Sequence, residues 1–205
     1  MNRQRGQALS LAALLLGWSV LAPRVPQRWH PAPHLLVGAA VVASTRAPLG
    51  LAPPALVQGL RWGSPVAATV VAVVAGSTML APVRAAMAAR ALPASPARWL
   101  LLGIPFGTVW SEEAAYRAAL AASASRAFGG TGGRWFTAAV FGLSHIPDAR
   151  AAHDSVPGTV LVTGAAGWVF SWLRDRSGSL AAPMLAHLAV NEAGAVAAVL
   201  MSRRR

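Results

Sequence analysis

The sequence predicts an all-α protein: a polytopic integral membrane helical bundle with about six to eight transmembrane helices. Composition is the first reason, because 55% of the 205 residues are hydrophobic and 12% are charged, about half of the ~25% typical of soluble domains. The mean hydropathy is +0.50. The six acidic and eighteen basic residues lie mostly between apolar blocks, so they do not supply the charged exterior that a soluble protein needs.

Apolar runs separated by Arg, Pro and Gly predict the individual helices, because a membrane span needs about 17 to 25 residues. The first run, 7–22, ends at Pro23 and follows a basic segment, so a cleaved signal peptide is the alternative. We favour a retained helix, since no clear small-x-small cleavage site is present and further spans follow. The remaining predicted spans are a short run at 34–45, then 65–83, 99–122, 135–146, 156–173 and 180–201.

The segments between these runs have their own signatures. Residues 49–62 have Pro near a helix start and moderate hydrophobicity, which predicts an interfacial helix with Trp62 at the level of the lipid head groups. Residues 84–98 are predicted to form a basic loop, and the Gly-rich residues 129–133 a flexible one. With Arg117 set aside as intramembrane, the loop arginines divide nine to eight between the two sides, so charge asymmetry does not fix the orientation.

All eighteen basic residues are arginines, and the formal net charge is +12. Such a charge is compatible with nucleic acid or with anionic lipid head groups as the partner. The arginines are spread over nearly every connection and do not form one stripe interleaved with aromatics, which favours the lipid bilayer and argues against nucleic acid. A coding bias toward Ala, Gly, Pro and Arg is a second explanation. The absence of cysteine excludes disulfides, thiolate metal sites and cysteine nucleophiles.

Three ionisable residues interrupt the apolar run 99–122. Glu112, Glu113 and Arg117 lie inside this run, where each charge costs about 2.5 to 3.5 kcal/mol on insertion scales. Glu113 and Arg117 are four residues apart, so they share a helix face and can neutralise one another as a structural pair. Glu112 has no such partner in its own helix. We therefore expect it to find partners on other helices.

Two further apolar runs carry polar residues that could serve as those partners. His145 ends an apolar stretch just before Pro147, while His187 and Asn191 are four residues apart and face the same way. A single buried histidine is usually structural. Three groups of polar residues on three helices of one small bundle are predicted to lie together in its interior. Each group raises the free energy of membrane insertion, and contacts among the three groups can offset that cost.

The other ionisable residues receive weaker interpretations. Three histidines lie in Pro-rich or charged connections and are predicted to be solvated: His30, His34 and His153. Three aspartates stand near arginines and look like loop charges: Asp148, Asp154 and Asp175. Glu192 follows Asn191 but lies about 100° round the helix from it, so at most it would support the site from outside.

The ordered set Glu112-Glu113-x-x-x-Arg117, Phe141-x-x-x-His145 and His187-x-x-x-Asn191 resembles the CAAX protease and bacteriocin-processing (CPBP, or Abi) family. Its eukaryotic relatives are type II CAAX prenyl endopeptidases. The resemblance covers about half of the chain and includes all three motifs, whose order on successive apolar segments is more specific than any one of them. It implies three parts: N-terminal membrane helices with the interfacial segment, 1–98; catalytic core helices, 99–201; and a basic tail, 202–205.

The resemblance implies an intramembrane endopeptidase that hydrolyses a peptide bond of a membrane-associated, CAAX-like or other protein or peptide. Transferred by position, Glu112 is the general base, His145 its partner in activating water, and His187 with Asn191 stabilises the oxyanion. Glu113, Arg117 and Phe141 support these catalytic residues. The chemistry is consistent, since peptide hydrolysis needs an activated water, donors for the oxyanion and a proton for the leaving amine. The expected location is a bacterial cell membrane.

Two histidines and a glutamate are also a familiar zinc-binding set. The sequence lacks a His-x-x-x-His pair with an intervening Glu, and the resembled family is glutamate-dependent, so we expect no cofactor and no metal, with zinc as the alternative. Two other functions stay open: a non-catalytic membrane scaffold or immunity protein, and a small proton-coupled transporter. No paired broken helices or inverted repeat supports a transporter. Neither the substrate, its prenylation nor the oligomeric state follows from the sequence.

Overall fold

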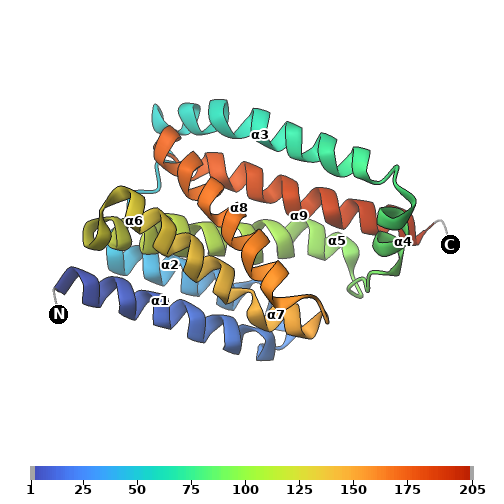
Figure 1. Ribbon diagram of the computed structural model, residues 1–205, viewed down its shortest axis with the longest axis horizontal. Coiled ribbons are helices and arrows are strands. Elements are labelled where there is room, and N and C mark those ends of the chain that lie inside the picture. Colours follow the sequence, from blue (N-terminus) through green and yellow to red (C-terminus); the bar gives the residue numbers. More distant parts are fainter. Residues whose placement is uncertain (1–2, 204–205) are drawn as a thin grey trace.

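The structure, a computed structural model, describes residues 3–203, and all the regular secondary structure of these residues is helical (Figure 1). The predicted all-α class is confirmed. The elements are α1 (Arg3–Leu21), η1 (Ala22–Arg24), η2 (Gln27–Trp29), α2 (Ala32–Thr45), α3 (Ala55–Ser77), α4 (Ala81–Ala89), α5 (Pro96–Arg98), η3 (Trp99–Trp110), η4 (Glu113–Leu120), α6 (Ala121–Ser144), α7 (Ile146–Ala151), α8 (Val156–Ser177) and α9 (Ala181–Ser202). The last two residues of the predicted basic tail lie outside the described residues.

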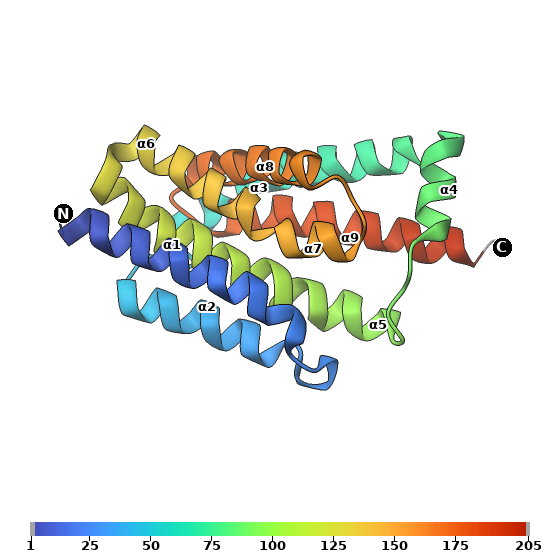
Figure 2. The ribbon, with the colours of Figure 1, turned by 60° about the horizontal axis from the view of Figure 1, so that its bottom comes forward.

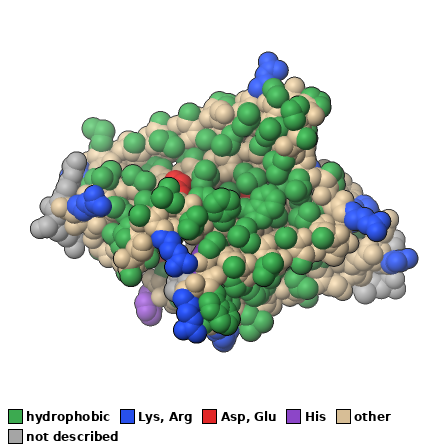
Figure 3. All heavy atoms as spheres, turned by 180° about the vertical axis from the view of Figure 1, so that it is seen from behind, with side chains coloured by type: hydrophobic (Ala, Val, Ile, Leu, Met, Phe, Trp, Pro, Cys, Tyr) green, Lys and Arg blue, Asp and Glu red, His purple; other side chains and the backbone are tan. Residues whose placement is uncertain are grey.

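Four helices within residues 3–203 are long and apolar enough to cross a membrane: Arg3–Arg24, Ala55–Ser77, Val156–Ser177 and Ala181–Ser202. At 1.5 Å per residue, 22 residues span about 33 Å, close to the ~30 Å hydrocarbon core. The helix Ala32–Thr45 is also apolar but shorter. Large hydrophobic side chains are exposed along most of these helices, and Figure 3 shows them covering one face of the molecule. This surface fits a bilayer and not water.

The predicted division between an interfacial helix at 49–62 and a span at 65–83 is wrong. The single helix α3, residues 55–77, takes in the larger part of both segments and contains Pro65. Gly59 and Gly63 let α3 lie directly against the start of α9, where a Cβ at Gly63 would be 2.8 Å from Ala182 Cα. This packing holds both halves of α3 on one axis, and a proline is tolerated inside a membrane helix when neighbours support it. Trp62 packs edge-on against Trp172 of α8.

Two predicted loops are largely helical. The expected basic loop 84–98 begins inside α4, an alanine-rich helix that has Pro82 in its first turn and packs against α9. The expected flexible loop 129–133 lies within α6, where Gly129 alone leaves helical geometry, with φ of 76°. Gly133 closes this corner, because a Cβ there would be 2.6 Å from the backbone nitrogen of Ser125. Glycine therefore supplies a tight reversal and not a flexible linker.

The helices surround the continuous segment formed by η3, η4 and the start of α6. On one side, α9 lies against η3, α3, α4 and α8; on the other, α2 packs against η3 and η4, and α1 packs against α6 (Figure 2). The start of α1 and the end of α9 lie at opposite ends of the bundle (Figure 1). This arrangement brings the middle of η3–η4, the end of α6 and the middle of α9 to one place.

Candidate active site

Glu112 and Glu113 stand at the junction of two π-helical segments, η3 and η4. Neighbouring residues of a helix point to different sides, so the two carboxylates separate. The Glu112 side chain is 28% exposed and faces a cavity, whereas the Glu113 side chain is fully buried. Wide helical turns of this kind are often found at functional sites.

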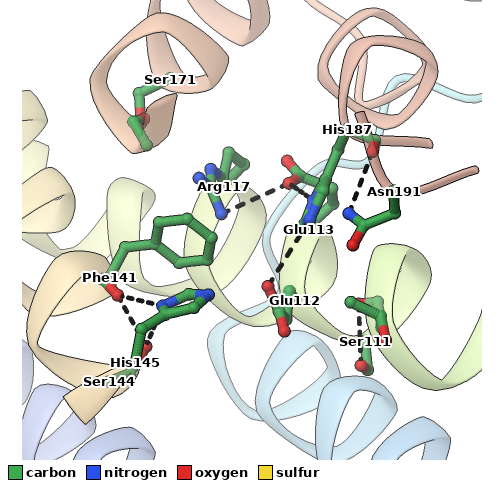
Figure 4. Close-up of polar contacts among 12 residues, drawn as sticks. Ser111, Glu112, Glu113, Arg117, Phe141, Ser144, His145, Ser171, His187 and Asn191 are labelled. Carbon is green, nitrogen blue, oxygen red and sulfur yellow. Dashed lines mark hydrogen bonds and ion pairs between the residues drawn. The ribbon is translucent and has the colours of Figure 1, made fainter. Parts of the chain in front are cut away.

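Glu113 contacts two buried side chains, Arg117 and His187 (Figure 4). Its Oε1 lies 3.3 Å from Arg117 Nη1, which is the ion pair expected from the four-residue spacing. The same oxygen accepts a hydrogen bond from His187 Nδ1 across 2.8 Å. The expectation of a purely local structural pair is therefore incomplete, because Glu113 also connects η4 to the motif on α9.

Arg117 is held by aromatic rings as well as by Glu113. Its guanidinium lies 3.9 Å from the centroid of Phe141 and 5.1 Å from that of Phe170. A charged group over an aromatic face is attracted by the ring quadrupole, and more strongly when water is excluded. Gly167 of α8 makes the space, since a Cβ there would be 2.8 Å from Phe141 Cδ1 and 3.3 Å from Arg117 Nη2.

His187 stands between the two glutamates. Its Nδ1 contacts Glu113, its Nε2 lies 3.8 Å from Glu112 Oε2, and its ring stacks on Phe170 with a centroid distance of 5.0 Å. Because a carboxylate accepts the bond at Nδ1, this nitrogen carries a hydrogen. In the neutral ring Nε2 then faces Glu112 as an acceptor; in the doubly protonated ring it is a second donor.

His145 caps the end of α6, and its ring is fixed by the local backbone. Its Nδ1 lies 2.8 Å from the carbonyl oxygen of Phe141, which also accepts the hydroxyl hydrogen of Ser144. A carbonyl can only accept, so Nδ1 carries the hydrogen and Nε2 of the neutral ring is left as an acceptor. The Phe141 ring packs against the His145 ring with a centroid distance of 4.6 Å.

Asn191 lies one turn beyond His187 on α9 and donates from Nδ2 to the His187 carbonyl oxygen at 3.1 Å. An amide nitrogen has two hydrogens, so this bond orients the carboxamide and leaves one donor for another partner. Asn191 lines the same cavity as Glu112 and His145. Three helices thus present polar groups to one space. Glu192 does not line this cavity.

The cavity has a volume of about 650 Å³. Its walls come from both halves of the chain, with Leu15 and Trp18 on α1, and Val37 and Gly38 on α2, opposite the residues of η3 and η4. Glu112 and His145 both line it, with no direct contact drawn between them in Figure 4. The N-terminal helices therefore complete the space around Glu112.

Three residues that we expected to be solvated or simple loop charges also line this cavity: His30, His34 and Asp148. Their place in the cavity wall has a tertiary cause, because the connection between α1 and α2 folds back over η3 and α7 turns beside His145. The His30 and His34 rings lie against each other at a tilt, with centroids 4.5 Å apart. The side chain of Asp148 is exposed, but the surrounding protein partly desolvates it and raises its pKa, an effect that the nearby His145 partly opposes. His153 is exposed, as expected.

Sequence reasoning missed the residues that frame the charged groups, namely Tyr116, Gly167 and Phe170. Tyr116 lines the cavity and packs edge-on against Phe141, while Phe170 supports His187 and Arg117. Gly167 and Phe170 lie in the apolar helix α8, where nothing in the local sequence distinguishes them from lipid-facing or core positions. Tyr116 had a signal, because it is the single tyrosine of the sequence and directly precedes Arg117.

Within residues 3–203, no three His, Asp or Glu side chains are grouped so that they could hold a metal ion. Glu113 Oε1 is contacted by both Arg117 and His187.

The fold and the site together define an integral membrane protein that holds a cluster of ionisable groups among its apolar helices. Residues 94–193 match a family model, that of the type II CAAX prenyl endopeptidase Rce1-like proteins, and this match indicates a protease. The match includes all three motifs, and the family recognised from them is confirmed. No curated protein and no solved structure matches the chain.

Proposed function

We propose that this protein is an intramembrane endopeptidase that hydrolyses a peptide bond of a membrane-associated protein or peptide, using water activated by Glu112. One observation carries the proposal: Glu112, His145 and Asn191, from three separate helices, open onto a single cavity, and His187 lies 3.8 Å from Glu112. The family match supports the same class of reaction. We propose a bacterial cell membrane as its location, as the motif resemblance implies.

In the proposed reaction, the Glu112 carboxylate takes a proton from a water molecule, whose oxygen attacks the peptide carbonyl carbon. His145 Nε2 is the second acceptor facing the cavity and holds the water in place. Breakdown of the tetrahedral intermediate breaks the C–N bond, and the proton on Glu112 passes to the leaving amine. Each group then returns to its starting state.

The negative charge that develops on the carbonyl oxygen needs donors that are already in position. Asn191 Nδ2 has one hydrogen free of its bond to the His187 carbonyl, and a doubly protonated His187 presents Nε2–H on the side of Glu112. Glu113 accepts from Nδ1 and fixes the ring, as the carboxylate of a catalytic triad does. Arg117 balances the charge of Glu113.

Glu112→Gln tests the proposal. This substitution removes the base while keeping the shape of the side chain, so cleavage should fall by at least about 10²-fold. Comparing the termini of membrane proteins in cells that carry either form of the enzyme would reveal the substrate in the same measurement. Glu192→Gln is a matched control, because it also removes one carboxylate from a membrane helix but outside the cavity.

The outcome also separates the alternative functions. Full cleavage by Glu112→Gln would refute the assignment of the base. A cellular phenotype that survives replacement of Glu112, His145 and His187 together would indicate a scaffold or immunity protein. Proton flux in liposomes that depends on Glu112 would indicate a transporter.

We further propose that the reaction uses no metal ion, because the carboxylate of Glu113 is taken up by Arg117 and His187. Exhaustive chelation should leave the cleavage rate unchanged, and elemental analysis of the purified protein should find no stoichiometric zinc. Loss of activity on chelation, with recovery on adding zinc, would contradict this.

A further inference from the structure

The cavity that Glu112, His145 and Asn191 line is called the catalytic cavity from here on, a name that rests on the proposed function. A second cavity of about 650 Å³ adjoins it at the end of the bundle where the chain leaves α4. Arg28, Ser95, Arg98, Trp99 and Leu102 line it, together with the connection 91–94. We call it the basic cavity. His30 and Thr108 line both cavities and therefore lie between them.

The basic cavity holds two guanidinium groups and no carboxylate. No acidic residue lines it, and within residues 3–203 neither Arg28 nor Arg98 forms an ion pair. Arg98 Nη2 donates to the His30 carbonyl oxygen at 3.0 Å, and the Arg28 guanidinium lies 5.7 Å from the centroid of the Trp29 ring. Burial and, secondarily, the charge of Arg98 lower the pKa of His30. This space is suited to an anion.

Its surroundings are those of a lipid-facing surface. Trp29 is 58% exposed, and Leu102 and Phe106, four residues apart on η3, are 44% and 47% exposed. Tryptophan is enriched at the level of the head groups, and exposed Leu and Phe on a membrane helix face acyl chains.

We propose that the basic cavity binds an anionic phospholipid, with its phosphate between Arg28 and Arg98 and an acyl chain along Leu102 and Phe106. Basic pockets between membrane helices recognise anionic head groups in this way, and guanidinium groups match the geometry of phosphate oxygens. A lipid is favoured over a peptide carboxylate because the apolar strip continues from the cavity onto the exposed surface of η3, whereas His30 stands between the cavity and Glu112.

The lipid would also support the catalytic cavity. His30 rests on Gly107, where any side chain would overlap its ring, and Arg98 anchors its backbone. A phosphate bound by both arginines joins the segment 28–30 to the segment 95–98. The bound phosphate would thereby hold His30 in position, and His30 forms part of the wall of the cavity that Glu112 lines.

The test uses the full chain purified in a neutral detergent, with phosphatidylglycerol or phosphatidylcholine added. Phosphatidylglycerol should raise Tm by at least about 3 °C, as a ligand of the folded state does, and phosphatidylcholine should not. The rise should disappear in the Arg28→Gln/Arg98→Gln variant. It should persist in Arg150→Gln/Arg203→Gln, which removes the same charge from exposed positions outside the cavity.

Each other outcome overturns the proposal. Equal stabilisation of both double variants would show a general charge effect of the surface. Equal stabilisation by glycerol 3-phosphate would show a phosphate site without a lipid. Stabilisation by an apolar peptide with a free carboxylate, but not by phosphatidylglycerol, would assign the cavity to substrate. Native mass spectrometry should find phosphatidylglycerol retained on the unaltered chain and lost from Arg28→Gln/Arg98→Gln, which checks binding directly.

Discussion

Glu113 is the residue that connects the charged groups of the site. It is fully buried, and one of its oxygens contacts both Arg117 and His187. A buried ion pair contributes little net stability, but removing one partner leaves a charge that nothing compensates. Stability and activity should therefore respond differently to substitution of this pair.

Arg117→Met should destabilise the protein by about 3 to 5 kcal/mol, because the buried Glu113 carboxylate loses its cation. The double variant Glu113→Gln/Arg117→Met should recover most of that stability, since no charge is left unpaired. Its cleavage activity should stay low, because His187 loses the carboxylate that orients Nδ1. Denaturation in mixed micelles and a cleavage assay measure the two effects. Full activity in the double variant would show that Glu113 has no positioning role.

At the residue scale, the sequence indicates which side chains raise the free energy of membrane insertion. It predicts some of the contacts that these side chains make, but not all of them. The spacing of Glu113 and Arg117 predicts their pairing correctly, because four residues along one helix is a local relation. The contact between Glu113 and His187 joins residues 74 positions apart, and no local pattern encodes it.

At the scale of elements, α8 sets the geometry of the site without contributing a charged group to it. Gly167 lets Phe141 and Arg117 lie directly against the α8 backbone. A Cβ at Gly164, one turn earlier, would have its nearest neighbour, the Ala138 carbonyl oxygen, at 3.5 Å. The two glycines share a helix and differ in the space around them.

Gly167→Ala should therefore reduce cleavage by at least about tenfold and destabilise the protein by about 1 to 3 kcal/mol, because the added methyl displaces Phe141 and Arg117. Gly164→Ala should have little effect on either, since a methyl at 3.5 Å is an ordinary contact. Both are measured by the cleavage assay and by thermal unfolding. Equal effects of the two substitutions would mean that helix propensity, and not the fit at Phe141, is responsible.

The helices themselves are predictable to different degrees. The long apolar runs that correspond to α1, α8 and α9 match these helices to within a few residues of their ends. Errors fall where proline, arginine or glycine interrupts a run, as at Pro65, in α4 and at Gly129. In each of these places packing against another helix, or a single glycine corner, overrides the local signal.

At the scale of the whole molecule, the N-terminal end of α1 and the C-terminal end of α9 lie at opposite ends of the bundle (Figure 1). The chain should then cross the bilayer an odd number of times. The loop arginines do not determine which end faces which side of the membrane. In either orientation, an odd number of crossings places the two ends on opposite sides.

The absence of cysteine allows a direct test, because single cysteines can be introduced without a background. Arg5→Cys and Ser202→Cys should react with a membrane-impermeant maleimide from opposite faces of sealed vesicles. The unaltered chain should not react. Labelling of both variants from the same face would contradict this topology.

The sequence by itself determined that this protein belongs in a lipid bilayer, where most of its helices lie, and which ionisable motif residues are candidates for its site, because composition and short-range spacing are local properties. Only the tertiary structure decided how these residues meet. It buried Glu113 against His187, turned Glu112 toward a cavity shared with α1 and α2, and brought His30 and Asp148 to its walls. The physical reason is that such contacts depend on close approach between helices, which glycines such as Gly107 and Gly167 permit.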